Sequence, residues 1–203
     1  MFKEIDCREE RMGNRKQRRL MEKLVHTREI SMRASDLGDH TIQVEGDLID
    51  HRYRTGPNVP SEERELVHHM LIRMKIKGPA MFIEQAEATM PHHPRQECPV
   101  VLPWIRKLEG VRIAPGFTMK VKRVVGGKNG CAHLTSLIIA MGESAVQGYW
   151  AAYGVEKGRE RGREQDLKKF INTCYLWRED GPIVKEFREP LESQAPSKRS
   201  EGA

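Results

Sequence analysis

Three segments in the first half of the chain alternate apolar and polar residues, as β-strands with one buried face do. The segments cover residues 42–51, 66–77 and 81–90. In the first segment, one side of the alternation carries Ile42, Val44, Gly46, Leu48 and Asp50. Gly78-Pro79 separates the last two segments and predicts a turn, so we expect an antiparallel hairpin there.

Apolar residues in the second half of the chain recur at helical spacing. This spacing predicts helices that begin near residues 99, 118, 131 and 167. The third helix is the longest, and its apolar stripe from Leu134 to Tyr149 predicts the main core helix. Strands that precede helices, without alternating crossovers, are typical of α+β domains. We therefore predict an α+β fold in which a small antiparallel sheet, spanning residues 42–90, is covered on one face by helices.

Charged residues concentrate towards the ends of the chain. The 203 residues include 35 Lys+Arg and 29 Asp+Glu, for a formal net charge of +6. Residues 1–28 are predicted to form a charged, flexible arm, residues 29–188 a single domain, and residues 189–203 a disordered tail. Nucleic acid is not favoured as a partner, because no aromatic residue is interleaved with the basic cluster at residues 11–19.

Two further segments near the C-terminal end are predicted to lack helix. Residues 154–166 are charged and punctuated by glycines, which predicts a loop. Ile183-Val184 follows the turn signal Asp180-Gly181-Pro182 and predicts a short extended segment.

The apolar runs and the cysteines bear on the compartment. No run approaches the roughly 18 apolar residues of a membrane span, and the N-terminus lacks an apolar signal core. We therefore expect a cytoplasmic protein with no membrane segment. In such a reducing compartment the cysteines at positions 7, 98, 131 and 174 are expected to be free thiols, thiolates or metal ligands.

A glycine-rich turn at residues 126–130 delivers a thiol and an imidazole to the start of the longest predicted helix. The free N–H groups of a helix N-terminus stabilise a thiolate, so Cys131 is expected to titrate below a free cysteine. Cys131 is then a candidate nucleophile, with His133 or a histidine distant in the sequence as its base. In the alternative interpretation, Cys131 is a small core residue at the head of the apolar stripe and His133 faces solvent.

The same residues could hold a metal ion. Sulfur and nitrogen donors from separate segments suit tetrahedral zinc or iron. The candidate ligands are Cys98, Cys131 and His133, completed by Cys174, His92 or a carboxylate. No Cys-x-x-Cys pair occurs, so each ligand would come singly. For His68-His69, in the second predicted strand, we expect a structural histidine rather than a ligand.

Five motifs occur in a fixed order along the chain. They are residues 44–50 (VEGDLID), 86–98, 108–116 (LEGVRIAPG), 130–134 (GCAHL) and 172–182. Together they resemble a bacterial family known only as domain of unknown function 2889, over about residues 30–187. The resemblance implies membership of that family and no particular reaction.

The order of elements also resembles the iron-sulfur scaffold proteins of the NifU and IscU type. In those proteins strands are followed by a cysteine-bearing loop, a helix, and a cysteine that opens a long helix. The resemblance implies that Cys98 and Cys131 are cluster ligands. The loop reads Glu97-Cys98-Pro99 in place of Gly-Cys-Gly, and the cysteine expected at the end of the intervening helix is missing, so His133 or Cys174 would substitute for it.

Three functions follow from these features, in order of preference. The first is a metal-binding or iron-sulfur-scaffold-like accessory protein with a site formed by Cys98, Cys131 and His133. The second is a thiol-dependent enzyme with Cys131 as nucleophile. The third is a non-catalytic module that binds a protein partner through its basic arm.

Overall fold

The sheet contains four antiparallel strands in sequential order. The computed structural model describes residues 23–54, 63–153 and 170–192. The strands are β1 (His26–Gly38), β2 (Thr41–Tyr53), β3 (Arg64–Lys77) and β4 (Phe82–His92), and they pair in the order β1-β2-β3-β4. The last three confirm the three predicted strands, and the hairpin of β3 and β4 lies where Gly78-Pro79 predicts it.

Strand β1 is absent from the sequence prediction, which assigned residues 1–28 to an arm and began the sheet at residue 42. Nearly every residue of β1 is exposed, although its full length pairs with β2. Its alternation of apolar and polar residues is short, from Ile30 to Ala34, and charged residues flank it. This short alternation did not distinguish β1 from the charged segment before it, and the strand is established by its hydrogen bonds to β2.

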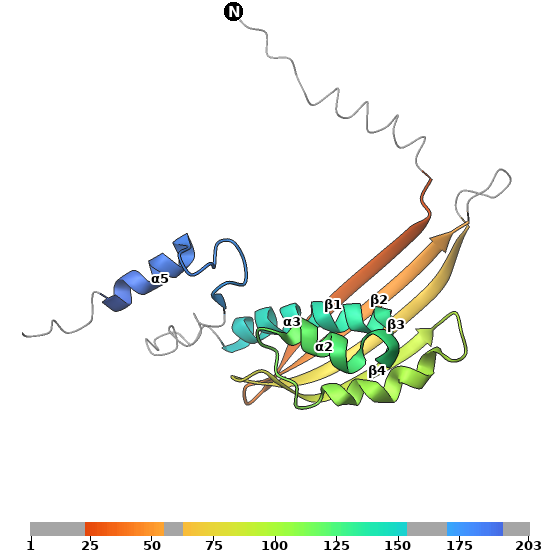
Figure 1. Cartoon of the computed structure of the whole chain (residues 1–203), viewed down its shortest axis with the longest axis horizontal. Helices are drawn as coiled ribbons and strands as arrows, with labels where there is room; N and C mark the ends of the chain where they lie inside the picture. Colours follow the sequence, from red (N-terminus) through yellow and green to blue (C-terminus); the bar gives the residue numbers. More distant parts are fainter. Residues whose placement is uncertain (1–22, 55–62, 154–169, 193–203) are drawn as a thin grey trace, which may run out of the picture.

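The helices are the 3₁₀ helices η1 (Cys98–Leu108) and η2 (Gly127–Asn129) and the α-helices α2 (Phe117–Val125), α3 (Ala132–Tyr153) and α5 (Pro182–Glu192). Helices η1, α2 and α3 lie on one face of the sheet, whereas α5 lies away from it (Figure 1). α3 contacts β1, β2 and β3, and η1 contacts β4. The α+β class and the single antiparallel sheet are thus confirmed. In the described part of the chain, no helix is long and apolar enough to cross a membrane.

The core lies between the sheet and α3. Its fully buried side chains come from alternate positions of β2 and β3 and from one stripe of α3, such as Leu48, Met74, Ile76, Leu134 and Met141. Gly46 of β2 allows α3 to approach closely, because a Cβ atom there would lie 2.6 Å from Sδ of Met141. The predicted apolar stripe of residues 134–149 is therefore the face that the longest helix buries.

Near the C-terminal end the structure differs from the sequence prediction. Residues 171–180 form turns, so the helix predicted to run to about residue 177 is wrong over that stretch. α5 replaces the predicted extended segment at residues 183–184 and continues to Glu192, beyond the predicted start of the tail. The predicted loop at 154–166, the arm up to residue 22 and the tail from residue 193 lie outside the described residues.

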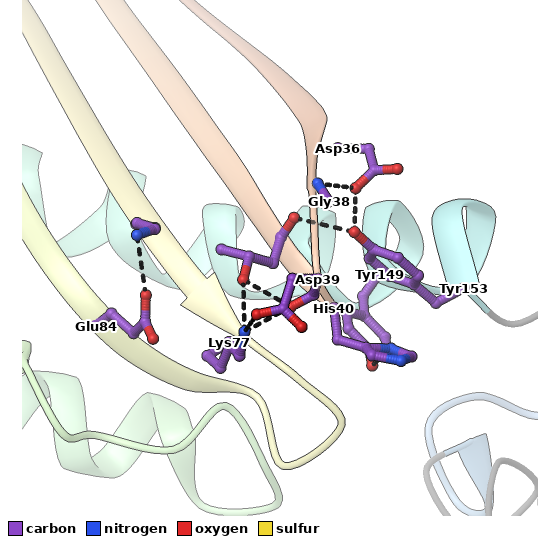
Figure 2. A network of polar contacts seen from close by, with 10 residues as sticks. Asp36, Gly38, Asp39, His40, Lys77, Glu84, Tyr149 and Tyr153 are labelled. Carbon is purple, nitrogen blue, oxygen red and sulfur yellow. Dashed lines mark hydrogen bonds and ion pairs between the residues drawn. The ribbon is translucent and has the colours of Figure 1, made fainter.

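A polar network fixes the turn between β1 and β2 (Figure 2). Asp39 and His40 at the turn have φ of 48° and 51°, a left-handed conformation that side chains of this kind adopt at some cost. Nζ of Lys77 donates to the backbone oxygen and to Oδ2 of Asp39, both at 2.6 Å. The adjacent strand β3 thereby holds the strained turn in place.

The C-terminal end of α3 is tied to the same turn. The hydroxyl of Tyr153 donates to Oδ1 of Asp36 and, at 3.2 Å, to the backbone oxygen of Thr41. Nδ1 of His40 lies 3.2 Å from the hydroxyl of Tyr149. Because α3 is fixed here, its direction across the sheet is set, and its first turn lies over the other end of β2.

Candidate metal centre

A buried carboxylate lies at that other end of β2. The side chain of Asp50 is 1 % exposed and belongs to the face that α3 covers. In the strand register Arg28 of β1 and His68 of β3 are its direct neighbours on either side. Directly opposed residues in antiparallel strands point to the same face, so the three side chains meet.

Arg28 forms a two-pronged ion pair with Asp50. Nε donates to Oδ1 and Nη2 to Oδ2, each at 2.7 Å. The hydrogen bond to Arg28 holds the pKa of Asp50 below its ordinary value, and the hydrogen bond to Asp50 raises the pKa of Arg28. A buried carboxylate needs such a partner to stay ionised. Asp50 is therefore an anion inside the protein.

Two histidines approach the same carboxylate oxygen. Nδ1 of His68 lies 3.0 Å from Oδ2 of Asp50, and Nε2 of His133 lies 3.5 Å from it. The two imidazole rings are stacked, with centroids 3.8 Å apart and planes inclined by 33°. The sheet supplies His68, and the first turn of α3 supplies His133.

The surroundings of His133 lower its pKa and favour its neutral form. Burial lowers its pKa from the ordinary 6.5, and the neighbouring His68 and Arg28 lower it further. The opposite effect of Asp50 is smaller than that of burial. A neutral imidazole has a free nitrogen lone pair, which both metal ligation and general-base catalysis require.

Cys131 contacts the far side of the His133 ring. Its Sγ lies 3.6 Å from Nδ1 of His133, while Nε2 of the same ring faces Asp50. The backbone oxygen of Cys131 accepts a hydrogen bond from the N–H of Thr135 at 2.9 Å, so Cys131 opens α3 as the sequence predicts. Thiol, imidazole and carboxylate thus form a continuous row.

The geometry of this cluster suits a metal ion. One ligand atom from each of Asp50, His68 and His133 lies within 4.8 Å of the other two. Zinc bound tetrahedrally through bonds of about 2.0–2.1 Å needs ligand atoms about 3.3 Å apart. The separations of 3.0 and 3.5 Å from Oδ2 of Asp50 bracket that value.

The structure brings some of the predicted site residues together. Cys131 and His133 are in contact, and both are only half-buried. Cys98 begins η1 and packs against the hydrophobic core, Cys174 is exposed in the turns after residue 170, and His92 is exposed at the end of β4. Among the described residues, the metal-ligand group contains neither Cys98 nor Cys174. Participation of these two cysteines stays a prediction.

Sequence analysis did not identify Arg28, Asp50 or His68 as site residues. One signal was present for Asp50, because it is the single charged residue on the apolar side of the alternation in residues 42–51. A charge on a buried face needs partners, and this requirement points to a site. Arg28 gave no such signal, since the strand that carries it was not predicted.

The fold and this cluster define the chain as an α+β protein with a buried Asp-His-His group. A family model described as "Protein of unknown function (DUF2889)" matches residues 26–147, more than half of the chain, so the protein belongs to this family. The match begins at the first residue of β1 and includes the whole cluster. No curated protein and no solved structure matches the chain significantly. The resemblance to iron-sulfur scaffold proteins stays a prediction.

Proposed function

We propose that the protein binds a divalent transition metal, with zinc as the first candidate, through Asp50, His68 and His133. The observation that carries this proposal is the convergence of three ligand atoms within 4.8 Å around a carboxylate that is 1 % exposed. Two imidazoles and a carboxylate are a common ligand set for zinc and for non-haem iron.

The ion pair with Arg28 is compatible with this ligand set. A carboxylate has about four lone-pair positions, and Arg28 uses one on each oxygen. The second lone pair of Oδ2, which faces His68 at 3.0 Å, would bind the metal. Cys131 would then accept the Nδ1–H of His133, as an outer partner that fixes the ring.

Three protein ligands leave a fourth position open, which is typical of catalytic rather than structural zinc sites. His133 and Arg28 are 26 % and 36 % exposed, so solvent reaches the cluster from one side. A metal-bound water at this position would have a strongly lowered pKa and could act in hydrolysis. An iron-sulfur cluster is less well supported, because its irons prefer thiolate ligands.

Calorimetric titration of metal-free protein with zinc chloride tests the proposal. We expect one strong site in the wild type and its loss in His68→Gln. Cys98→Ser should bind zinc as the wild type does, because Cys98 is outside the proposed ligand set. His92→Gln, which removes an exposed histidine from β4, is the matched control for the histidine substitution. Wild-type affinity in His68→Gln would contradict the proposal.

Thiol-dependent catalysis is the second candidate function. The row from Sγ of Cys131 through His133 to Asp50 has the order of a nucleophile, its base and the group that orients the base. The distances of 3.6 and 3.5 Å are longer than those of a formed catalytic pair. In this function His68 packs on the base and holds no metal.

Alkylation by iodoacetamide in the presence of a chelator separates the two functions. If Cys131 is an activated nucleophile, it reacts faster than the more exposed Cys174, and His133→Gln removes the difference. If Cys131 is only the outer partner of a metal ligand, Cys174 reacts faster than Cys131 in both proteins.

A further inference from the structure

The two edges of the sheet differ in how they are covered. At the β4 edge, the chain after η1 runs alongside the strand, and Ile83 exchanges backbone hydrogen bonds with Val111 and Gly110 at 3.0 and 2.8 Å. Farther along, the N–H of Ala86 donates to the side chain of Glu109 at 3.4 Å. These contacts occupy outward-facing groups in the first half of β4 and block further pairing there.

The β1 edge carries no such cover in the described part of the chain, and Figure 1 shows β1 as the outermost strand. β1 has 13 residues, and its pairing with β2 is regular from His26 to Asp36. It contains neither proline nor lysine, which proteins commonly place on an edge to prevent pairing. Ile30 and Met32 on this strand are 39 % and 36 % exposed.

From these features we infer that a second copy of this chain pairs with β1, so that two antiparallel β1 strands join the sheets into one of eight strands. The twofold axis passes through Ser31. In this register Glu29 lies opposite Arg33 of the second copy, and Ile30 lies opposite Met32. Symmetry repeats each pair, so the interface contains two ion pairs and two apolar pairs.

The charges select this register over its neighbours. Outward-facing N–H and C=O groups belong to every second residue, so a twofold axis can pass through a residue but not between two residues. An axis through Met32 would leave Glu29 and Arg33 opposite serines and would oppose only Arg28 and Asp36, which already bind Asp50 and Tyr153. An axis through Ile30 would place Glu29 opposite Ser31. With the axis at Ser31, every charge at the centre of the strand has an opposite charge as its direct neighbour.

The two faces of the joined sheet remain consistent in this arrangement. Glu29 and Arg33 pair with Ile49 and Glu45 of β2 and lie on the face away from the helices. Ile30 and Met32 lie opposite Leu48 and Gly46, on the face that α3 covers. Pairing therefore extends the apolar layer under the helices and the polar layer on the other side.

Charge reversal tests this dimer by sedimentation equilibrium of the full chain. Glu29→Arg and Arg33→Glu should each weaken dimerisation by about tenfold or more, because each replaces two ion pairs by two repulsions. The double variant restores opposite charges and should recover most of the affinity. Glu143→Arg, on the exposed side of α3, should have no effect. Circular dichroism of each variant shows that the fold is kept.

Disulfide cross-linking tests the register. Ser31→Cys should form a reducible dimer on oxidation, because two directly opposed residues in antiparallel strands have Cα atoms about 4.5–5.5 Å apart, within the range that disulfides span. Ser35→Cys, on the same strand and face, should not, because it lies opposite Thr27. A wild-type protein that is monomeric throughout would overturn the inference. A dimer that persists in both Glu29→Arg and Arg33→Glu would also overturn the inference, because another surface would then form the interface.

Discussion

Asp50 is the residue on which the polar cluster depends. It brings a negative charge into the buried face of the sheet, and the two strands beside it and α3 each supply a nitrogen-bearing side chain to that charge. Removing the charge leaves Arg28 without its partner in a partly buried position. Removing one partner of a buried ion pair destabilises a protein by more than the intact pair stabilises it, because the other charge is left buried and unpaired.

We therefore expect Asp50→Asn to lower the free energy of unfolding by about 2 kcal/mol, below the range for fully buried pairs because Arg28 is 36 % exposed. Urea denaturation of the metal-free protein measures the change. The matched control is Glu84→Gln, which breaks the exposed pair with Lys75 and should leave the denaturation midpoint near that of the wild type. Equal effects of the two substitutions would show that Asp50 has no special role in stability.

The lowered pKa of His133 predicts a pH dependence of the metal-free fold. Below pH 6.5 the unfolded chain protonates this histidine while the folded chain still holds it neutral, so stability falls as the pH drops from 6.5 towards the lowered folded-state value. The lowered pKa of Asp50 acts in the same direction at more acid pH.

Urea midpoints at several pH values between neutrality and mild acid check this expectation. His133→Gln should lose less stability on acidification than the wild type, whereas His92→Gln should follow the wild type. If His133→Gln and the wild type lose stability in parallel, His133 is not held neutral in the folded protein.

At the scale of the element, the segments that bury an apolar face were predicted from the sequence, and the others were not. β2, β3, β4 and α3 each turn an apolar face to one core, and their periodicity located them to within a few residues. β1 has only a short apolar alternation, and α5 begins at the turn signal Gly181-Pro182 and contains Pro190, so neither was predicted. Cys131 and His133 were found because they open a strongly periodic helix, whereas Arg28 and His68 acquire their role only through strand pairing.

Packing between helices gives a prediction at this scale. A Cβ atom on Gly142 of α3 would lie 2.5 Å from the ring of Phe117 in α2, so the two helices approach as closely as glycine permits. We expect Gly142→Ala to destabilise the fold by about 1–2 kcal/mol, although alanine favours helix.

A double-mutant cycle with Phe117→Leu isolates the clash. The loss in the double variant should be smaller than the sum of the two single losses by about 0.5 kcal/mol or more, because the smaller side chain makes room. Additive losses would place the cause of the Gly142→Ala effect elsewhere.

At the scale of the whole molecule, a metal ion would join the sheet to α3. Asp50 and His68 precede His133 by more than 60 residues in the chain, and the metal would link them at the end of α3 opposite the network in Figure 2. A ligand that binds only the folded protein stabilises it by about 2.7 kcal/mol at a concentration of 100 times Kd.

We accordingly expect zinc to raise the melting temperature of metal-free protein by about 5 °C or more. Magnesium should have no effect, because it prefers oxygen ligands in an octahedral arrangement. His68→Gln should remove the zinc effect and Cys98→Ser should keep it, as scanning calorimetry can show. An equal rise in His68→Gln would indicate that zinc stabilises the protein through another site.

X-ray absorption at the zinc edge tests the central claim most directly, because it distinguishes nitrogen and oxygen ligands from sulfur. For zinc-loaded wild-type protein, a site formed by Asp50, His68 and His133 requires every ligand atom to be nitrogen or oxygen, at about 2.0–2.1 Å. The spectrum should also show the scattering typical of two imidazole rings. A sulfur ligand at about 2.3 Å would contradict the account and would instead support a site formed by Cys98 and Cys131.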